Sequence, residues 1–483
     1  MKLSAANLVN TAFSVPSRKR VGIVAAYSLL GGLSVVIGVA VACAPLAPIV
    51  PASGAAAKSG TPTISAKPTA STGERAGANR PTIKGERAGV LGGHDRMAWI
   101  ALAGKAPVAR VSATGTWQVN EQGGRTLLVR GAGAESWQVE RKGGLLRISG
   151  DGGDATPWRE GPFVARPTNR DSYVQFAGKR YRGELWFTAT DTGVLVVNRL
   201  PVEDYLRGVV PIELGTRAEA DRSALEAQAV AARSYSYIRI PREDAQQPRS
   251  GWHMVATVAN QVYGGLDVEA PVVNSAVDAT AGLVIQYGGL LVDAPYSASC
   301  GGRSSQPSEI WHDAHNEPYL QNLDDLNPAT GRPYCDISPR ANWTATFDQS
   351  QLTDVVMRHL RDAGAVSPKV GSLTGLKIED RFPSGRVRTL QVQTERGDVT
   401  FSADEIRALF RDARGAILSS TYFSVDRESR EHGHLTGVTL RGTGNGHGVG
   451  MCQWGAIGRA RAGQDFRTIL QHYYPGTVVG FVD

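Results

Sequence analysis

The stretch Leu200-Pro-Val-Glu-Asp-Tyr-Leu-Arg-Gly-Val-Val-Pro-Ile-Glu-Leu214 decides much of what can be predicted about the fold. Pro201 is a favourable first residue of a helix, and the apolar residues after it recur at helical spacing. We expect Pro211 to break this helix, because proline lacks the backbone N–H that a helix interior needs. The stretch therefore predicts a short helix that ends just before a carboxylate, Glu213.

Glu213 is the only carboxylate in the apolar run 209–214, and helical spacing puts it on the face that should turn inward. Burial raises the pKa of a carboxyl because it disfavours the charged form. A raised pKa suits a general acid that works near neutral pH. The same pattern allows a structural role, in which Glu213 caps a turn or pairs with Arg217 or Arg233, and both roles remain open at this point.

The rest of this region mixes helix and strand signals. Ser223-Ala-Leu-Glu226 and Ser402-Ala-Asp-Glu405 match capping boxes and predict two more helices. The pair Gly288-Gly289 between two apolar runs is typical of a β-hairpin. A strand at 437–441 should lead through a glycine-rich turn to a helix from Met451. Because helices and strands mix without regular βαβ alternation, we expect an α+β fold.

The chain of 483 residues divides into four segments by composition. Residues 97–199 consist of short apolar runs between glycine-rich turns, which predicts a small β-rich module. Residues 51–96 are mostly Ala, Gly, Ser, Thr, Pro and Lys, too polar to form a core, so we expect a flexible linker. The remaining segments are a membrane or signal segment at 1–50 and one C-terminal domain at 200–483.

The N-terminus predicts export. The basic cluster Ser17-Arg-Lys-Arg20 precedes residues 21–50, none of which is charged. A run of this length can cross a bilayer, and the basic flank should stay in the cytoplasm while the rest lies outside. Because the apolar stretch exceeds that of an ordinary secretory signal, we expect an uncleaved anchor. Ala40-Val-Ala-Cys43 also resembles a lipoprotein cleavage box, so anchoring through Cys43 remains open.

Composition argues against nucleic acid as a partner. The hydrophobic content of 42% is ordinary for a globular protein, and the net charge is +7. Such a small excess could suit an acidic polymer, but no basic run is interleaved with aromatic residues, so a solvated surface is the simpler interpretation. The GxGxxG pattern fails at its last position and no Walker sequence occurs, so nucleotide binding is not supported.

The four cysteines contain no CxxC pair, and neither HExxH nor another recognised ligand spacing occurs, so we predict no metal and no cofactor. In an oxidising compartment Cys300 and Cys335 could form a disulfide, with Cys452 left reduced and buried beside the glycine-rich turn. A Cys300 nucleophile with His447 as its base is a further alternative.

Gly442-Thr-Gly-Asn-Gly-His-Gly-Val-Gly450 places glycine at every second position. Glycines at this spacing clear one face of an extended segment, so that a ligand or another backbone can approach it closely. Asn445 and His447 then lie on the opposite face. A tight turn would explain the glycines but not the histidine among them.

Five segments in this order resemble the SpoIID/LytB family, named for stage II sporulation protein D and the amidase enhancer, and the resemblance runs from about residue 108 to 482. They are Leu200 to Leu214 as quoted above, Ala224-Leu-Glu-Ala-Gln-Ala-Val-Ala-Ala-Arg-Ser-Tyr235, Asn260-Gln-Val-Tyr-Gly-Gly265, Tyr296-Ser-Ala-Ser-Cys-Gly-Gly302 and Gly446-His-Gly-Val-Gly-Met-Cys-Gln-Trp-Gly-Ala456. The family usually has Ser and Met where Ile212 and Leu214 stand here. Some members bind zinc through a His/Cys cluster just before Gln-Val-Tyr, where residues 255–260 offer neither residue.

The resemblance implies a peptidoglycan lytic transglycosylase that cleaves glycan strands already stripped of stem peptides, with Glu213 as the catalytic acid. Hydrolytic glycosidases use two carboxylates. A lytic transglycosylase needs one, because the sugar's own C6 hydroxyl is the nucleophile. Glu213 would protonate the leaving oxygen and then accept the hydroxyl proton, which leaves a 1,6-anhydro-muramyl end. Candidate substrate-binding residues in the expected glycan cleft are Tyr205, Gln228, Asn445, His447, Gln453 and Trp454.

The family also implies a second function class, a non-catalytic peptidoglycan-binding enhancer of a cell-wall amidase. In either case the expected partners are glycan strands, a cell-wall amidase or other wall-remodelling proteins, and the membrane through the N-terminal segment. The expected location is extracytoplasmic.

Overall fold

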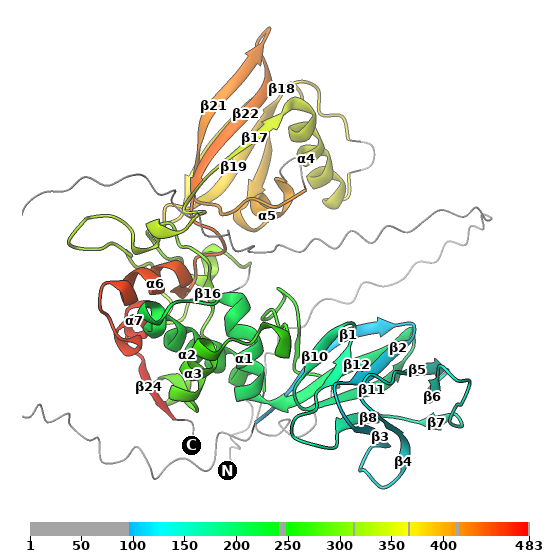
Figure 1. Ribbon diagram of the computed structural model, residues 1–483. Helices are drawn as coiled ribbons and strands as arrows, with labels where there is room; N and C mark the ends of the chain where they lie inside the picture. Colours follow the sequence, from blue (N-terminus) through cyan, green and yellow to red (C-terminus); the bar gives the residue numbers. More distant parts are fainter. Residues whose placement is uncertain are drawn as a thin grey trace, which may run out of the picture. The chain divides into compact units, whose positions relative to one another are not determined.

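The computed structural model describes residues 96–481 apart from 241–247, 249, 313, 366–367 and 412–414. The predicted anchor, Cys43 and nearly all of the predicted linker therefore lie outside the described residues. In the described part, seven α-helices combine with mainly antiparallel sheets, which confirms the α+β class (Figure 1). None of the helices in those ranges is both long and apolar enough to span a bilayer.

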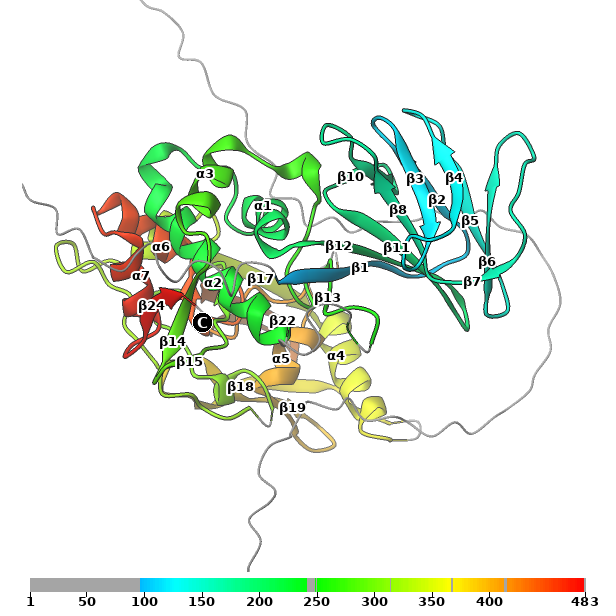
Figure 2. The ribbon, with the colours of Figure 1, turned by 90° about the horizontal axis from the view of Figure 1, so that it is seen from below.

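Residues 97–201 form two sheets, as the short apolar runs predict (Figure 2). The strand order is β13-β1-β12-β11-β8-β3-β4 in one sheet and β10-β9-β2-β5-β6-β7 in the other. The strands are β1 (Met97–Ala106), β2 (Ala109–Ala113), β3 (Trp117–Glu121), β4 (Leu127–Gly131), β5 (Trp137–Lys142), β6 (Leu145–Gly150), β7 (Arg159–Glu160), β8 (Phe163–Pro167), β9 (Val174–Phe176), β10 (Lys179–Tyr181), β11 (Glu184–Thr190), β12 (Gly193–Pro201) and β13 (Met254–Val255).

Strand β12 runs directly into a helical layer, and one hydrophobic core is shared by the sheets and these helices. The helices are α1 (Val202–Glu213), α2 (Arg222–Arg239), α3 (Pro271–Ala279), α6 (Gln453–Arg461) and α7 (Phe466–Tyr473). Figure 1 shows α6 and α7, from the end of the chain, against α2. An alanine-rich face of α2 explains this close approach, because Leu225, Ala229 and Ala232 are all fully buried.

Two helix boundaries differ from the predictions. Pro211 does not break α1, which continues to Glu213. Pro211 has no N–H, so one helical hydrogen bond is lost close to the end of the helix. The helix still continues past it, because Leu214 N–H donates to Val210 O at 3.0 Å. Helix α2 begins at Arg222 without a side-chain cap, so the predicted capping box is wrong. Glu226 instead pairs with Arg222 one turn before it.

Short strands lie beside several of the family-like segments. The predicted hairpin is confirmed as β14 (Leu283–Tyr287) and β15 (Leu290–Leu291). Gly288 and Gly289 between them have φ values of 57° and 81°, which only glycine adopts readily. Strand β16 (Tyr296–Ser297) pairs in parallel with β23 (Met451–Cys452), and β24 (Val478–Phe481) pairs with β14.

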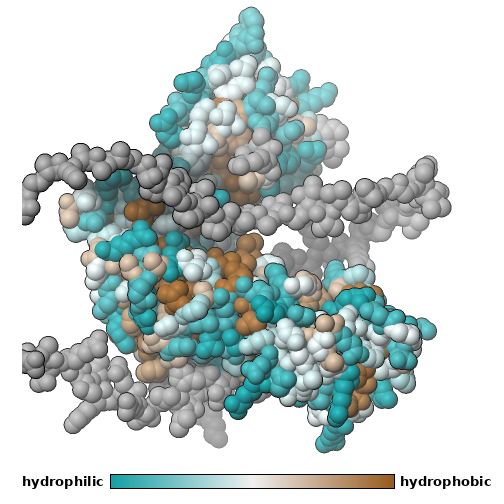
Figure 3. Space-filling view, in the orientation of Figure 1, coloured by the Kyte–Doolittle hydropathy of each residue, from teal (hydrophilic) through white to brown (hydrophobic). Residues whose placement is uncertain are grey.

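Residues 342–443 contain a second hydrophobic core, which the sequence analysis did not separate from the rest of 200–483. Its elements are β17 (Asn342–Asp348), α4 (Gln349–Asp362), β18 (Leu373–Arg381), β19 (Val387–Thr394), β20 (Val399–Ser402), α5 (Ala403–Leu409), β21 (Phe423–Glu431) and β22 (His434–Thr443). The predicted capping box of α5 is confirmed, with Ser402 N–H bonded to Glu405 at 2.9 Å. On the face drawn in Figure 3, apolar residues form separate patches among hydrophilic ones.

Candidate active site

Glu213 lies at the last position of α1, partly exposed, where three of the sequence motifs meet. Its Oε1 accepts a hydrogen bond from Val262 N–H at 3.1 Å, and its Oε2 accepts one from Gln453 Nε2 at 3.4 Å. Burial raises the pKa of the Glu213 carboxyl, and these two hydrogen bonds, which favour the charged form, offset part of that rise. The site thus holds a carboxyl that keeps its proton to a higher pH than an exposed glutamate does.

Gln453, the first residue of α6, is held by a buried partner. Its Nε2 lies 3.3 Å from Oε1 of Gln228, which is fully buried in α2. Gln228 Nε2 has no hydrogen-bond partner among the described residues. Gln228, a predicted substrate-binding residue, is therefore enclosed, and it contacts the site through Gln453.

Two tyrosines, the buried Tyr205 and the partly buried Tyr296, lie near enough to the carboxylate to feel its charge. Tyr205 is fully buried, and its hydroxyl donates to Gln261 Oε1 at 3.1 Å, while Gln261 Nε2 bonds the Tyr296 hydroxyl at 2.9 Å. Burial, and then the nearby charge of Glu213, raise the pKa of both tyrosines, so both phenols stay neutral. The Tyr205 hydroxyl donates in its bond to Gln261, and the Tyr296 hydroxyl accepts in its bond from Gln261. Sequence reasoning missed Gln261, Val262 and Tyr296 as site residues, although the quoted motifs contain all three.

His447 lies beside a cavity of about 460 Å³ that Trp311 and Arg407 also line. Its ring centroid is 5.0 Å from that of Trp311. Burial and then the Arg407 charge lower the pKa of His447 to about 4, so the imidazole is neutral near pH 7. Glu213 is not among the residues that line this cavity.

Asn445 and Trp454 are placed by the backbone of the same loop. Asn445 exchanges two backbone hydrogen bonds of 2.8 Å with Ser299, and Trp454 N–H donates to Ala298 O at 3.0 Å. The guanidinium carbon of Arg217 lies 4.6 Å from the Trp454 ring centroid, so a cation already covers one face of that ring.

The alternating glycines of 442–450 accommodate another backbone segment. A Cβ on Gly450 would lie 2.0 Å from Pro295 O, and one on Gly444 would lie 2.9 Å from Ser299 O. Both glycines also have positive φ values. The spacing therefore lets the two loops that carry Cys300 and His447 pack directly on each other.

Arg233, one of the two pairing candidates for Glu213, is bound elsewhere. It is fully buried and forms an ion pair of 2.7 Å with Glu203. The Glu203 carboxylate of that pair also accepts from Gly282 N–H at 3.1 Å.

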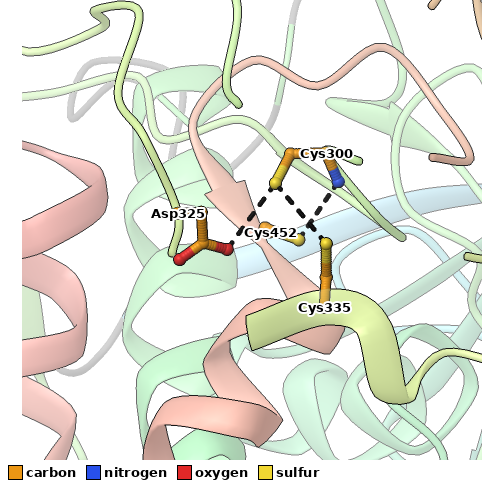
Figure 4. Close-up of side chains that lie close together, drawn as sticks. All are labelled: Cys300, Asp325, Cys335 and Cys452. Atoms are coloured by element: carbon orange, nitrogen blue, oxygen red, sulfur yellow. Dashed lines mark hydrogen bonds between the residues drawn. The ribbon is translucent and has the colours of Figure 1, made fainter. Parts of the chain in front are cut away.

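The cysteines of the predicted disulfide lie close together. Cys300 and Cys335 are buried free thiols with their Sγ atoms 3.8 Å apart, and the thiol of Cys452 lies in the same cluster (Figure 4). The disulfide stays a prediction. Cys300 is only 1% exposed, which leaves a nucleophile at this position without access to a polymer.

A larger cavity of about 890 Å³ lies next to the second core. Trp343, Arg381, Tyr422 and Arg441 line it, together with Gly301 beside Cys300.

Comparison with known proteins gives the family. The SpoIID family model, described as stage II sporulation protein, matches residues 190–287, and a model of a domain of unknown function matches 336–450. An uncharacterised protein of Brachyspira hyodysenteriae is 30% identical over 306 residues, which cover 62% of this chain and 72% of that protein. The second match falls on the second hydrophobic core.

Two named relatives come from Bacillus subtilis. The amidase enhancer is 30% identical over 57% of this chain, which spans 40% of the enhancer. Stage II sporulation protein D is 26% identical over 59% of this chain and 76% of its own length. The chain belongs to the SpoIID/LytB family, and this membership supports a function related to the cell wall.

Proposed function

We propose that the chain is a lytic transglycosylase that cleaves peptidoglycan glycan strands outside the cytoplasm, with Glu213 as its acid–base group. The observation that carries this proposal is the Glu213 carboxyl, buried enough to raise its pKa and oriented by Val262 N–H and Gln453 Nε2. A general acid needs both a raised pKa and a fixed direction of proton delivery.

A one-carboxylate mechanism fits the surroundings of Glu213. Hydrolytic glycosidases place their two carboxyls at most about 9.5 Å apart. Glu203 and Asp204 precede Glu213 on α1 by ten and nine residues, which separates them by about 13 Å or more along the helix axis. Both are also engaged by arginines, Glu203 by Arg233 and Asp204 by Arg207. These two carboxylates are therefore unsuited to activate water opposite Glu213.

In the proposed reaction, protonated Glu213 gives its proton to the glycosidic oxygen as the bond to C1 breaks. The C6 hydroxyl of the same muramyl residue then attacks C1, and carboxylate Glu213 accepts the hydroxyl proton. This restores the acid and closes the 1,6-anhydro ring. The amide of Gln453 donates to the carboxylate form and so stabilises the intermediate state of Glu213.

We predict that the purified full-length chain releases 1,6-anhydro-muramyl products from peptide-free glycan strands. Mass spectrometry distinguishes the outcomes, because a hydrolase that uses water leaves reducing ends instead. Intact peptidoglycan in a parallel reaction tests the expected preference for stripped strands. Reducing ends as the only new products would contradict the proposed chemistry.

A binding role is the second candidate, because the amidase enhancer of Bacillus subtilis is 30% identical to this chain. An enhancer would bind glycan strands without producing new ends and would increase release of stem peptides when an amidase is added. Co-sedimentation with peptidoglycan, followed by product analysis with and without amidase, separates the two functions. Binding with no new ends supports the enhancer and contradicts the enzyme.

The pH dependence of the glycan cleavage rate should reflect the raised pKa of Glu213. Cleavage needs the protonated acid, so the rate should fall as pH rises through the pKa of Glu213 in the complex. An unperturbed glutamate titrates near about 4.3. Because burial raises the pKa of Glu213, the descending limb of the pH–rate profile should lie at higher pH than that value. The measurement is the initial rate of anhydro-end formation from about pH 4 to 8. A limb centred at the ordinary glutamate value would contradict the assignment.

A further inference from the structure

Four buried ligand groups from distant parts of the sequence meet in one place (Figure 4). They are Cys300 in the loop after β16, Asp325, Cys335 in the short helical turn Tyr334–Ile337, and Cys452 at the start of α6. The ligand atoms all lie within 4.8 Å of one another. The function proposed above uses none of these groups.

The spacing of these atoms matches a single tetrahedral ion. Zinc binds thiolate sulfur at about 2.3 Å, which places two sulfur ligands of a tetrahedron about 3.8 Å apart. The Sγ atoms of Cys300 and Cys335 are 3.8 Å apart, and Asp325 Oδ2 is 3.6 Å from Cys300 Sγ. Three soft sulfur ligands favour zinc over magnesium or calcium, which prefer oxygen. We infer that Cys300, Asp325, Cys335 and Cys452 bind one Zn²⁺ ion.

The surroundings also suit a metal centre of net negative charge. Three thiolates and one carboxylate around Zn²⁺ leave a charge of about −2, which needs cations nearby. Arg459 donates to Asp325 Oδ1 at 2.9 Å and is 6% exposed. Arg386 is fully buried, donates to Cys300 O at 2.9 Å and pairs with no carboxylate among the described residues. The ion at this site would give that isolated guanidinium a counter-charge.

Donors around the cluster fix the ligands, as outer partners do in metal sites. Cys452 Sγ accepts from Cys300 N–H at 3.1 Å and from Gly455 N–H, in the first turn of α6, at 3.3 Å. Asp325 Oδ2 accepts from the Tyr473 hydroxyl at 2.8 Å. A Cβ on Gly455 would lie 2.2 Å from that oxygen, so only glycine allows α6 to approach so closely.

The position of the site gives the ion a structural role. All four ligands are buried, which leaves no open coordination position for a substrate. Cys452 immediately precedes Gln453, which bonds Glu213, and the Cys300 loop pairs with Asn445 through Ser299. The ion would thus hold the start of α6 and two loops in register around the candidate active site. The metal site does not depend on the reaction proposed for Glu213.

The test is zinc content of the full-length chain, purified without chelator and measured by elemental mass spectrometry, together with a count of free thiols after denaturation. We expect one zinc per chain and no disulfide among the three cysteines. Cobalt(II) exchanged into the site should show tetrahedral d–d bands and a thiolate-to-cobalt charge-transfer band. A metal-free chain with a Cys300–Cys335 disulfide would overturn the inference and establish the alternative bond.

Single variants show whether these residues are the ligands. Cys335→Ser and Asp325→Asn should each weaken zinc retention against a competing chelator by about 100-fold or more, since even outer partners contribute 10- to 100-fold. Asp324→Asn is the matched control, because Asp324 is an exposed neighbour that does not belong to the cluster. If a variant fails to fold, the cobalt spectra of the wild-type chain still test whether the site binds a metal through thiolates. Zinc retained by Cys335→Ser at wild-type strength would contradict the site.

Discussion

Replacing Glu213 by glutamine should reduce glycan cleavage at least about 100-fold, because acid–base catalysis typically contributes about 10²–10⁴. Glutamine keeps the shape of the side chain, and its carbonyl oxygen can still accept a hydrogen bond from Val262 N–H, but it cannot deliver a proton. Binding to insoluble glycan should therefore survive while the release of 1,6-anhydro ends is lost. The measurement is product formation at matched amounts of bound protein.

Glu226→Gln is the matched control. Glu226 lies on α2, and its partly buried carboxylate pairs with Arg222 at 2.9 Å. The Glu226→Gln variant should cleave glycan within about twofold of the wild-type rate, because the Glu226 side chain forms no hydrogen bond to Glu213 or Gln453. Cleavage by Glu213→Gln at the wild-type rate would show that another group is the acid.

The Glu213→Gln variant should also be more stable than the wild type near neutral pH. Burial raises the folded-state pKa of Glu213 above its unfolded value, so its contribution to stability is full below the unfolded pKa and is lost as pH rises through the folded pKa. Glutamine does not ionise and avoids this loss. The difference in melting temperature between the variant and the wild type should grow with pH and vanish in acid. A difference independent of pH would contradict the raised pKa.

The sequence predicts local structure where short-range chemistry determines it. The Gly288-Gly289 hairpin and the capped helix at Ser402 form as expected, because their turn and cap geometry depends on a few adjacent residues. Glu213 could be chosen for its apolar surroundings, and the structure does place it where burial raises its pKa. The capping box at Ser223 failed because the helix begins two residues earlier, at Arg222, with Asp221 at the N-cap position.

Other features depend on contacts that no local pattern contains. Cys300, Asp325, Cys335 and Cys452 have none of the spacings typical of a metal motif, and they meet only because β16 pairs with β23 and the Tyr334–Ile337 turn packs on α6. The second core at 342–443 was hidden because helix and strand signals continue across it. A clue was present, since no family segment falls between residues 303 and 445.

Breaking the buried ion pair of Arg233 and Glu203 should destabilise the packing of α1, α2 and β14. Arg233 is fully buried, pairs with Glu203 at 2.7 Å and donates to Leu283 O at 3.0 Å. Arg233→Met should lower the free energy of unfolding by about 3 kcal/mol, because it leaves the Glu203 charge without a partner in a mostly buried place. Arg222→Met, which breaks an exposed pair with Glu219 and a partly buried pair with Glu226, should cost less than Arg233→Met.

A double variant separates the unpaired charge from lost packing. If the cost of Arg233→Met comes mainly from the Glu203 carboxylate, adding Glu203→Gln should recover part of the lost stability, because a neutral amide is cheaper to bury. The amide oxygen introduced by Glu203→Gln can still accept from Gly282 N–H, as the carboxylate does at 3.1 Å. Urea unfolding of the four chains in this cycle gives the coupling energy. A double variant less stable than Arg233→Met alone would mean that Glu203 stabilises the fold through contacts other than Arg233.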